Sequence, residues 1–266
     1  MLARKDRPAS RRGKYMTIKI HGMTCGWLNM PLGDFLKGEE GQIRAPVLSY
    51  LIEHPKGRVV FDSGMHKSMQ EDPKARIGEW ADYFGIEFQA GEDLAARLGQ
   101  LDVAVENVDY LINSHLHFDH AGGNHAMCDC PVVLQKREWE AGQDPDLAAA
   151  NGLSKADFDL GQDMKLVDGE HDVFGDGSMV CIPTFGHTPG HQSLMVKTDG
   201  GDVLLTGDAC YLRRSLEELR LPSVAHDEVQ AMASLKRVKD LEARGAKLIF
   251  GHDPDQWETA EPTRVA

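Results

Sequence analysis

Short apolar runs separated by polar turns dominate the first part of the chain. Thr17–His21, Val47–Ile52 and Arg58–Phe61 have the composition of β-strands. Pro and Gly in the intervening Glu53–Gly57 favour a turn, so the last two runs predict a hairpin. From Lys67 to Leu101 the pattern becomes polar and helix-favouring, with several aromatic residues. This segment predicts either a cap over a pocket or an ordinary surface helix with its connecting loop.

Further along the chain, four strand-like runs are each followed closely by His or Asp. These pairs are Val108–Ile112 with His115, Met179–Ile182 with His187, Val203–Leu205 with Asp208, and Lys247–Phe250 with His252. Side chains just beyond the carboxyl ends of strands of one sheet converge at the edge of that sheet. We therefore expect the four segments to form one site at one sheet edge.

The segment Glu228–Ala243 predicts an amphipathic helix, with Val229, Met232, Leu235 and Val238 on its apolar side. Strand-like runs mixed with helices predict a layered α/β protein. No low-complexity linker or repeat interrupts the pattern. Residues 16–266 are therefore predicted to form a single domain, preceded by a basic, disordered tail at residues 1–15.

The charge of the chain narrows the classes of partner. The 266 residues carry a formal net charge of −13, which repels phosphate backbones and argues against nucleic acid. No apolar stretch reaches the roughly 20 residues of a membrane-spanning helix, and the basic start lacks the apolar segment of a signal peptide. We expect a cytoplasmic protein without a membrane partner.

The cysteines do not form a recognisable framework. Their number is odd, and they are Cys25, Cys128, Cys130, Cys181 and Cys210. Their spacing matches neither a zinc knuckle nor a disulfide-rich domain, which favours free thiols in a reducing compartment. A soft-metal site at Cys128 and Cys130 is the alternative to packing for that pair.

The densest chemical signal lies between Ser114 and Asn124. His115, His117, Asp119 and His120 fall within six residues and are followed by Gly-Gly. Neutral imidazole and carboxylate are the ligands that Zn²⁺, Fe and Mn favour. His115 and His117 are two apart in extended backbone and should point the same way, whereas the next two belong to a turn. One motif can thus supply two neighbouring metal ions.

This motif, His-x-His-x-Asp-His, resembles the signature of the metallo-β-lactamase superfamily. Its other elements follow in order, with His187 in His-Thr-Pro-Gly-His, Asp208 after an apolar strand, and His252 after the last one. Asp62 matches the early Asp-x-Gly turn. The resemblance runs from about Met16 to Trp257. It implies a four-layer αβ/βα sandwich of two mixed β-sheets with helices outside.

The resemblance also implies a site for two divalent metal ions. It assigns one ion to His115, His117 and His187, the other to Asp119, His120 and His252, and a bridging role to Asp208. Zinc is the expected metal, with Fe, Mn or Co as alternatives. The bridging Asp argues against penicillin-degrading activity, where Cys is usual. His in place of the Glu of diiron members argues against redox chemistry.

Within the superfamily the chain looks most like the N-acyl-homoserine lactonases. The likeness rests on residues 115–124, on His-Thr-Pro-Gly-His-Gln-Ser, on Asp-Ala-Cys-Tyr at 208–211 and on Gly-His-Asp-Pro at 251–254. It implies that a metal-bridging hydroxide opens the lactone ring. In this hypothesis Tyr211 stabilises the oxyanion, Asp119 returns a proton to the ring oxygen, and Phe118 contacts the apolar part of the substrate. His191 and Cys210 are interpreted as structural.

Several alternatives stay open on sequence grounds. In one alternative the substrate is a different lactone, such as a pyridine-derived one. In another it is a thioester of the glyoxalase II type, although the chain has no basic C-terminal segment for glutathione. A nuclease or a non-catalytic metal-binding scaffold fits less well. We expect a monomer or homodimer, with Trp27–Leu36 contributing to a dimer contact. Substrate selectivity is expected from two loops, Gly26–Ile43 and Lys67–Leu101.

Overall fold

One β-sheet contains the first half of the chain and its last residues. The computed structural model describes residues 17–127, 129–257, 259 and 261–266, and in them this sheet has seven strands in the order β12-β1-β2-β3-β4-β5-β6. The strands are β1 (Lys19–Pro31), β2 (Gln42–His54), β3 (Gly57–Phe61), β4 (Tyr110–Ile112), β5 (Val132–Gln135), β6 (Met164–Val167) and β12 (Thr263–Arg264). From β12 to β3 neighbours are antiparallel, and from β3 to β6 they are parallel. The hairpin predicted from the turn at 53–57 is confirmed as β2 and β3.

The second sheet comes from the C-terminal half. Among the described residues it has five strands in the order β11-β10-β9-β8-β7. They are β7 (His171–Asp172), β8 (Met179–Pro183), β9 (Gln192–Thr198), β10 (Gly201–Leu205) and β11 (Lys247–Ile249). Only β10 and β11 are parallel. Both sheets are therefore mixed, as the resemblance implied.

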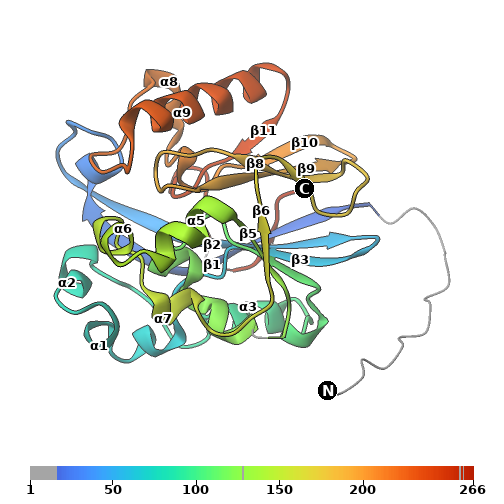
Figure 1. The fold of residues 1–266 in the computed structure, drawn as a ribbon, viewed down its shortest axis with the longest axis horizontal. Helices are drawn as coiled ribbons and strands as arrows, with labels where there is room; N and C mark the ends of the chain where they lie inside the picture. Colours follow the sequence, from blue (N-terminus) through green and yellow to red (C-terminus); the bar gives the residue numbers. More distant parts are fainter. Residues whose placement is uncertain (1–16, 128, 258, 260) are drawn as a thin grey trace.

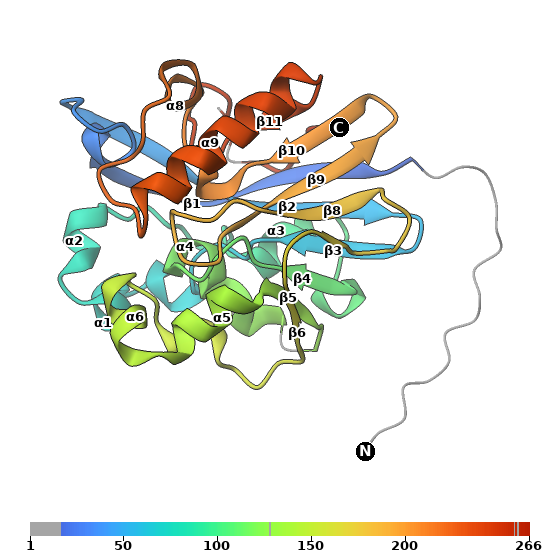
Figure 2. The same ribbon diagram turned by 45° about the horizontal axis from the view of Figure 1, so that its top comes forward.

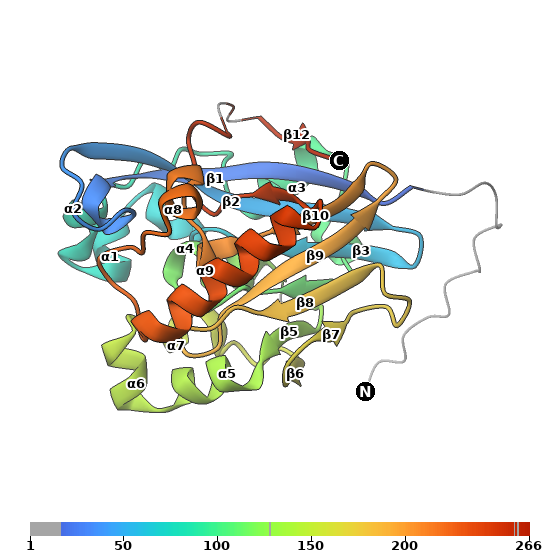
Figure 3. The ribbon, with the colours of Figure 1, turned by 90° about the horizontal axis from the view of Figure 1, so that it is seen from above.

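Helices cover the outer faces of the two sheets (Figure 1). The described α-helices are α1 (Pro73–Ile77), α2 (Trp80–Phe84), α3 (Leu94–Gln100), α4 (Phe118–Ala121), α5 (Lys136–Gln143), α6 (Pro145–Ala150), α7 (Lys155–Phe158), α8 (Arg213–Glu218) and α9 (Glu228–Ala243). Figure 2 shows α8 and α9 on one side of the sandwich and α1 to α6 towards the other, where Figure 1 also places α7. Seen from above, α9 lies across β8, β9 and β10 (Figure 3). The four-layer αβ/βα sandwich is confirmed.

The largest apolar cluster fills the space between the two sheets. Ile52, Phe61 and Ile112 from one sheet meet Leu194 and Leu205 from the other, and all five are almost fully buried. Removing that much apolar surface from water is the main force that holds the sheets together. Smaller clusters pack the helices onto the outer faces. The core thus fixes the two sheets relative to each other at the end where the candidate ligands lie.

Helix α9 has the predicted bounds, but one of its residues faces the other way. Asp227 caps the helix by accepting from the backbone N–H groups of Val229 and Gln230, at 2.9 and 3.0 Å. Leu235 and Val238 are buried as predicted. Val229, assigned to the same apolar side, is 81% exposed. Val229 is nine residues from Val238, and at about 100° per residue this places it on the opposite side of the helix, so the prediction was wrong there.

The segment Gly26–Ile43 is not the loop expected from sequence. Strand β1 continues to Pro31 and β2 begins at Gln42, so only the middle of the segment connects strands. The apolar side chains of Trp27, Leu28 and Leu36 are at most 6% exposed. They pack inside the chain and offer little surface to the dimer contact predicted for Trp27–Leu36. The dimer contact itself stays a prediction.

Residues 1–15, predicted to be a tail, lie outside the described residues, as does Cys128. A single domain over 16–266 therefore stays a prediction. Cys130 is buried in an apolar cluster beside α3, and a soft-metal site shared with Cys128 stays a prediction. In the part of the chain that the structure describes, no helix is both long and apolar enough to cross a membrane.

Candidate metal centre

The candidate ligands come from loops that follow strands of both sheets. His115 and His117 follow β4 of the seven-stranded sheet, whereas His187, Asp208 and His252 follow β8, β10 and β11 of the other. The expectation of a single sheet edge was therefore wrong. The carboxyl ends of these strands meet because the sheets are stacked face to face. A backbone hydrogen bond of 2.8 Å, from the Gln192 N–H to the Ser114 carbonyl, joins the two sides directly.

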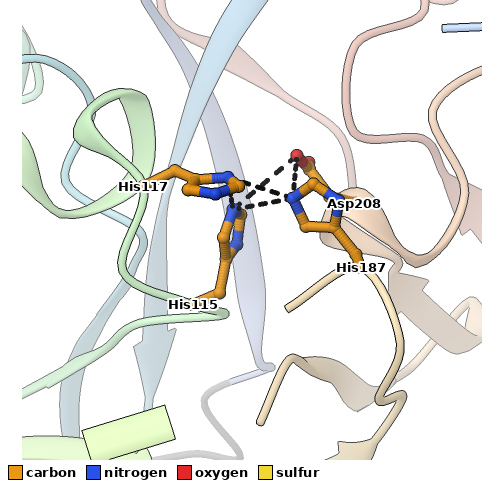
Figure 4. A group of neighbouring side chains, drawn as sticks. All are labelled: His115, His117, His187 and Asp208. Carbon is orange, nitrogen blue, oxygen red and sulfur yellow. Dashed lines mark hydrogen bonds and ion pairs between the residues drawn. The ribbon is translucent and has the colours of Figure 1, made fainter. Parts of the chain in front are cut away.

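Three imidazoles and one carboxylate form the first group. One potential ligand atom each from His115, His117, His187 and Asp208 lies within 4.8 Å of the others, and the rings point toward one another (Figure 4). The Nε2 atom of His187 is 3.2 Å from Nε2 of His115 and 3.1 Å from Nδ1 of His117. Nitrogen ligands of a tetrahedral zinc ion, at about 2.0–2.1 Å from it, are roughly 3.3 Å apart. The spacing fits such an ion.

A second group lies beside the first. Single ligand atoms of Asp119, His120 and His252 approach within 4.8 Å of one another, and all three side chains are buried. Asp208 faces both groups. Its Oδ1 lies 3.1 Å from Nε2 of His252 and 3.3 Å from Nε2 of His120, while its Oδ2 lies 3.3 Å from Nε2 of His187. One carboxylate oxygen is thus directed at each group.

The buried polar atoms and carboxylates of the two ligand groups favour a bound cation. The Nε2 atom of His120 and Oδ1 of Asp208 are buried without a hydrogen-bond partner, which is costly unless another group satisfies them. Although burial opposes it, the carboxylates of Asp208, Asp119 and Asp62 raise the pKa of His120 well above its usual value. Burial lowers the pKa of His115 and His187 far below theirs, so these two imidazoles are neutral. Neutral imidazoles beside several carboxylates fit divalent metal ions.

The ring nitrogen that points away from the centre has a partner in each of the five histidines. The pairs are His115 Nδ1 with Ser114 Oγ (2.9 Å), His117 Nε2 with the Asn151 carbonyl (2.8 Å), His120 Nδ1 with Asp62 Oδ2 (2.9 Å), His187 Nδ1 with the Tyr211 hydroxyl (3.2 Å), and His252 Nδ1 with the Pro46 carbonyl (2.8 Å). The partner of His117, His120 and His252 is a carbonyl or carboxylate oxygen, which only accepts, so it holds a proton on that nitrogen. In these three rings the other nitrogen faces the centre and is the one available to a metal ion, which is the usual arrangement around metal ions.

Asp62 supports this arrangement from the turn after β3. Its carboxylate accepts hydrogen bonds from the Ser114 N–H (2.6 Å) and the Ser114 hydroxyl (2.8 Å), besides its contact with His120. Its φ of 57° lies in the left-handed region, which is unusual for a residue other than Gly. Burial raises the pKa of Asp62, while His120 opposes the shift. Asp62 therefore fixes the start of the ligand loop and the ring of His120.

The Gly-Gly of the motif is explained by a close approach of this turn. A Cβ on Gly123 would lie 2.1 Å from the backbone oxygen of Ser63, and one on Gly122 would lie 2.6 Å from the backbone nitrogen of His66. Backbone atoms cannot move aside as a flexible side chain does. Only glycine lets the segment after His120 pack against the turn that contains Asp62.

Gly123→Ala should therefore destabilise the protein. Overpacking of a well-packed interior costs typically about 1–3 kcal/mol, and here the clash is with backbone. We expect the free energy of unfolding in urea to fall by at least that amount. Gly99→Ala is the matched control, because nothing lies within 4 Å of its added Cβ. Equal stability of the two variants would contradict this explanation of the motif.

His191 and Cys210 have the structural roles expected of them. His191 is fully buried, and its Nε2 accepts a hydrogen bond of 2.9 Å from the backbone N–H of Asp208. Its Nδ1 lies 2.9 Å from the Thr184 hydroxyl. Burial lowers the pKa of His191 to about 3, so the ring is a neutral acceptor. Cys210 is 2% exposed in an apolar cluster under α9, and burial raises the pKa of its thiol.

Aromatic side chains line one side of the centre. Tyr211 is 9% exposed and packs edge-on against Phe35, with ring centroids 5.1 Å apart. Burial raises the pKa of Tyr211 well above its usual value, so the phenol keeps its proton. Phe118 contacts Phe84 of α2 at 4.9 Å between centroids. Helix α2 thus packs beside Phe118, whereas α3 packs on the seven-stranded sheet. A cap over a pocket stays a prediction.

One known protein family matches most of this chain, including all of the candidate ligands. The sequence profile of the metallo-beta-lactamase superfamily matches residues 43–252. The chain belongs to the metallo-β-lactamase superfamily. All of the candidate ligands lie within the range that the superfamily profile covers, and His252 is its last residue.

Several similar proteins are N-acyl homoserine lactonases by name. The N-acyl homoserine lactonase AttM of Azorhizobium caulinodans is 33% identical over 231 residues, which cover 83% of this chain and 87% of that protein. An N-acyl homoserine lactonase of Bacillus cereus is 33% identical over 217 residues, covering 80% and 84%. The solved structure of an N-acyl homoserine lactone hydrolase, with N-hexanoyl-L-homoserine bound at its catalytic metal centre, aligns with a TM-score of 0.80. It is 29% identical, and the alignment covers 91% of this chain and 96% of that one.

Proposed function

We propose that this protein is a dinuclear-metal hydrolase that opens the ring of N-acyl-homoserine lactones. The observation that carries the proposal is the position of Asp208, whose two oxygens face two separate groups of ligand atoms. The names of the similar proteins support the same reaction class. An acidic chain of net charge −13 also suits a neutral acyl lactone better than a polyanionic substrate.

We assign one ion to His115, His117 and His187, and the other to Asp119, His120 and His252, with Asp208 between them. Zinc is the proposed metal, because the donor set is imidazole and carboxylate and the nitrogen spacing suits a tetrahedral ion. A pair of such ions supplies a water-derived nucleophile at neutral pH and polarises the carbonyl that is attacked. The protein residues supply the remaining parts of the reaction.

Tyr211 is proposed to stabilise the oxyanion that develops on the lactone carbonyl. With a proton on Nδ1, His187 donates to the Tyr211 oxygen across 3.2 Å. The hydroxyl proton of Tyr211 then remains available for the substrate. A buried, fixed donor of this kind stabilises developing negative charge more effectively than water does.

Asp119 is proposed to carry the proton that the leaving ring oxygen needs. Its carboxylate is 6% exposed, and Oδ2 lies 3.5 Å from Nε2 of His120 and 3.8 Å from Nε2 of His252. It therefore lies at the centre, within reach of a proton released from water. Transfer of that proton to the alkoxide oxygen completes ring opening.

Phe118 is proposed to contact the apolar acyl portion of the substrate. It precedes Asp119 directly and is continuous with a line of rings through Phe84 to Trp80 and Tyr83 on α2. Trp80 is 60% exposed, so the line leads from the buried centre to the surface. Apolar rings in this position suit an acyl chain that extends out of the site.

The substrate class is tested with zinc-loaded protein and a panel of substrates. The panel contains N-acyl-homoserine lactones of several chain lengths, a pyridine-derived lactone, a glutathione thioester and a phosphodiester. We expect the highest kcat/KM with an N-acyl-homoserine lactone, measured by the acid released on ring opening. A higher kcat/KM for the thioester or the phosphodiester would replace the proposal with a glyoxalase II-like or a nuclease function. Stoichiometric zinc without turnover of any substrate would indicate a non-catalytic scaffold.

A further inference from the structure

A fully buried carboxylate outside the ligand set joins two parts of the centre. Glu138 is the third residue of α5 and is 0% exposed. The two segments that it contacts are named here the first ligand loop (Ser114–His117) and the second ligand loop (Thr184–His191). The first follows a strand of the seven-stranded sheet, and the second follows a strand of the five-stranded sheet.

The contacts of Glu138 divide between the two loops. Its Oε1 accepts a hydrogen bond of 3.1 Å from the N–H of Leu116, in the first ligand loop. Its Oε2 accepts from the Thr188 hydroxyl at 2.9 Å and from the Gly190 N–H at 2.7 Å, in the second ligand loop. A buried carboxylate that accepts several hydrogen bonds holds its donors firmly, because losing any of them leaves a buried polar group unsatisfied.

The second ligand loop is also pressed directly against the start of α5. A Cβ on Gly190 would lie 2.3 Å from the backbone nitrogen of Glu138. The guanidinium of Arg137 lies over the ring of Phe185, 4.3 Å from its centroid. The start of α5, which carries Glu138, is therefore closely packed against the second ligand loop.

We propose that Glu138 is a positioning residue of the metal centre, which sets the distance between the first and second ligand loops. The inference rests on the proposed two-metal site. The first group of ligands is split between these loops, with His115 and His117 on one and His187 on the other. An ion bound there needs both loops at the right separation. The Glu138 carboxylate bonds to both of them directly.

Glu138→Gln tests this role at nearly constant volume. The amide has one acceptor oxygen and one NH₂ donor in place of two acceptors. Whichever way the amide turns, one backbone N–H, of Leu116 or of Gly190, faces a donor. The variant should bind zinc at the first group on the order of 10–100-fold more weakly, as for other residues that orient metal ligands. The affinity is measured with Zn²⁺ alone, by competition with a chromogenic chelator, so no substrate is involved.

Asp93→Asn is the matched control, since it changes another buried carboxylate. Asp93 is 5% exposed and caps α3 by accepting from the Ala96 N–H. Both variants should lower the melting temperature of the metal-free protein, but only Glu138→Gln should weaken zinc binding. Zinc affinity of Glu138→Gln within twofold of wild type would overturn the proposal, whatever the melting temperature.

A milder variant decides the question if Glu138→Gln does not fold. Thr188→Val removes one of the three donors and leaves the carboxylate and both backbone N–H groups in place. It should weaken zinc binding in the same direction by a smaller factor, and unchanged affinity would overturn the proposal. A different set of results would contradict the proposed lactonase function and leave the role of Glu138 intact. In that case the wild-type protein binds two zinc ions, and Glu138→Gln weakens that binding, but no lactone in the panel is hydrolysed.

Discussion

Asp208→Asn should abolish most of the lactonase activity, with kcat/KM falling on the order of 10³-fold or more. The paired ions contribute several kcal/mol of transition-state stabilisation, and each 1.36 kcal/mol corresponds to a tenfold change in rate. Asparagine keeps the size of the side chain but has a neutral amide with one acceptor oxygen. It cannot present an anionic oxygen to both His187 and His252, as Asp208 does.

The measurement combines kinetics with metal analysis. Zinc content by elemental analysis should fall below two equivalents in Asp208→Asn, and steady-state kinetics with an N-acyl-homoserine lactone gives the loss of kcat/KM. Asp202→Asn, at an exposed position near the start of β10, the strand that precedes Asp208, should change neither quantity. Two tightly bound equivalents of zinc together with wild-type turnover in Asp208→Asn would exclude the bridging role.

Tyr211→Phe should lower kcat for the lactone by about 10²–10³-fold, which is the usual effect of losing one oxyanion donor. The change removes the hydroxyl and keeps the ring that packs against Phe35. It also removes the partner of His187 Nδ1, so zinc content has to be measured in the same preparation. We expect two equivalents of zinc, as in the wild-type protein.

Tyr83→Phe is the control for Tyr211→Phe. The hydroxyl of Tyr83 donates to Oδ2 of Asp34 at 2.6 Å, away from the ligand atoms. Its loss should leave kcat unchanged. If Tyr211→Phe retained the kcat of the wild-type protein, Tyr211 would have no part in the reaction. If kcat and zinc content fell together, the phenol would act through His187 and not on the substrate.

The ligand-bearing segments could be predicted from sequence because local patterns specify them. A buried strand followed closely by His or Asp is a short-range signal, and Gly122-Gly123 marks the close approach of two backbone segments. The bounds of α9 could also be predicted from the sequence, because Asp227 at its N-cap precedes a periodic apolar pattern.

The parts that could not be predicted depend on long-range packing. Nothing local shows that β4 belongs to a different sheet from β8, β10 and β11, so the expectation of one sheet edge failed. The carbonyl groups of Pro46 and Asn151 hold His252 and His117 in place, but a backbone oxygen has no signature in the sequence. Glu138 was missed for a similar reason, because a single Glu in a short helix resembles a surface residue until both of its loops are placed.

The exposure of Trp80 gives the centre an intrinsic optical probe. Trp80 is 60% exposed, whereas Trp27 and Trp257 are 6% and 5% exposed and Trp139 is partly buried, so a water-soluble quencher such as acrylamide reaches the indole of Trp80 most readily. The ring of Trp80 contacts Phe84, and the ring of Phe84 contacts Phe118. A molecule that is bound at the centre and has a long alkyl tail along these rings would therefore shield the indole of Trp80. Fluorescence can therefore follow the arrival and departure of such a molecule in real time, without any label.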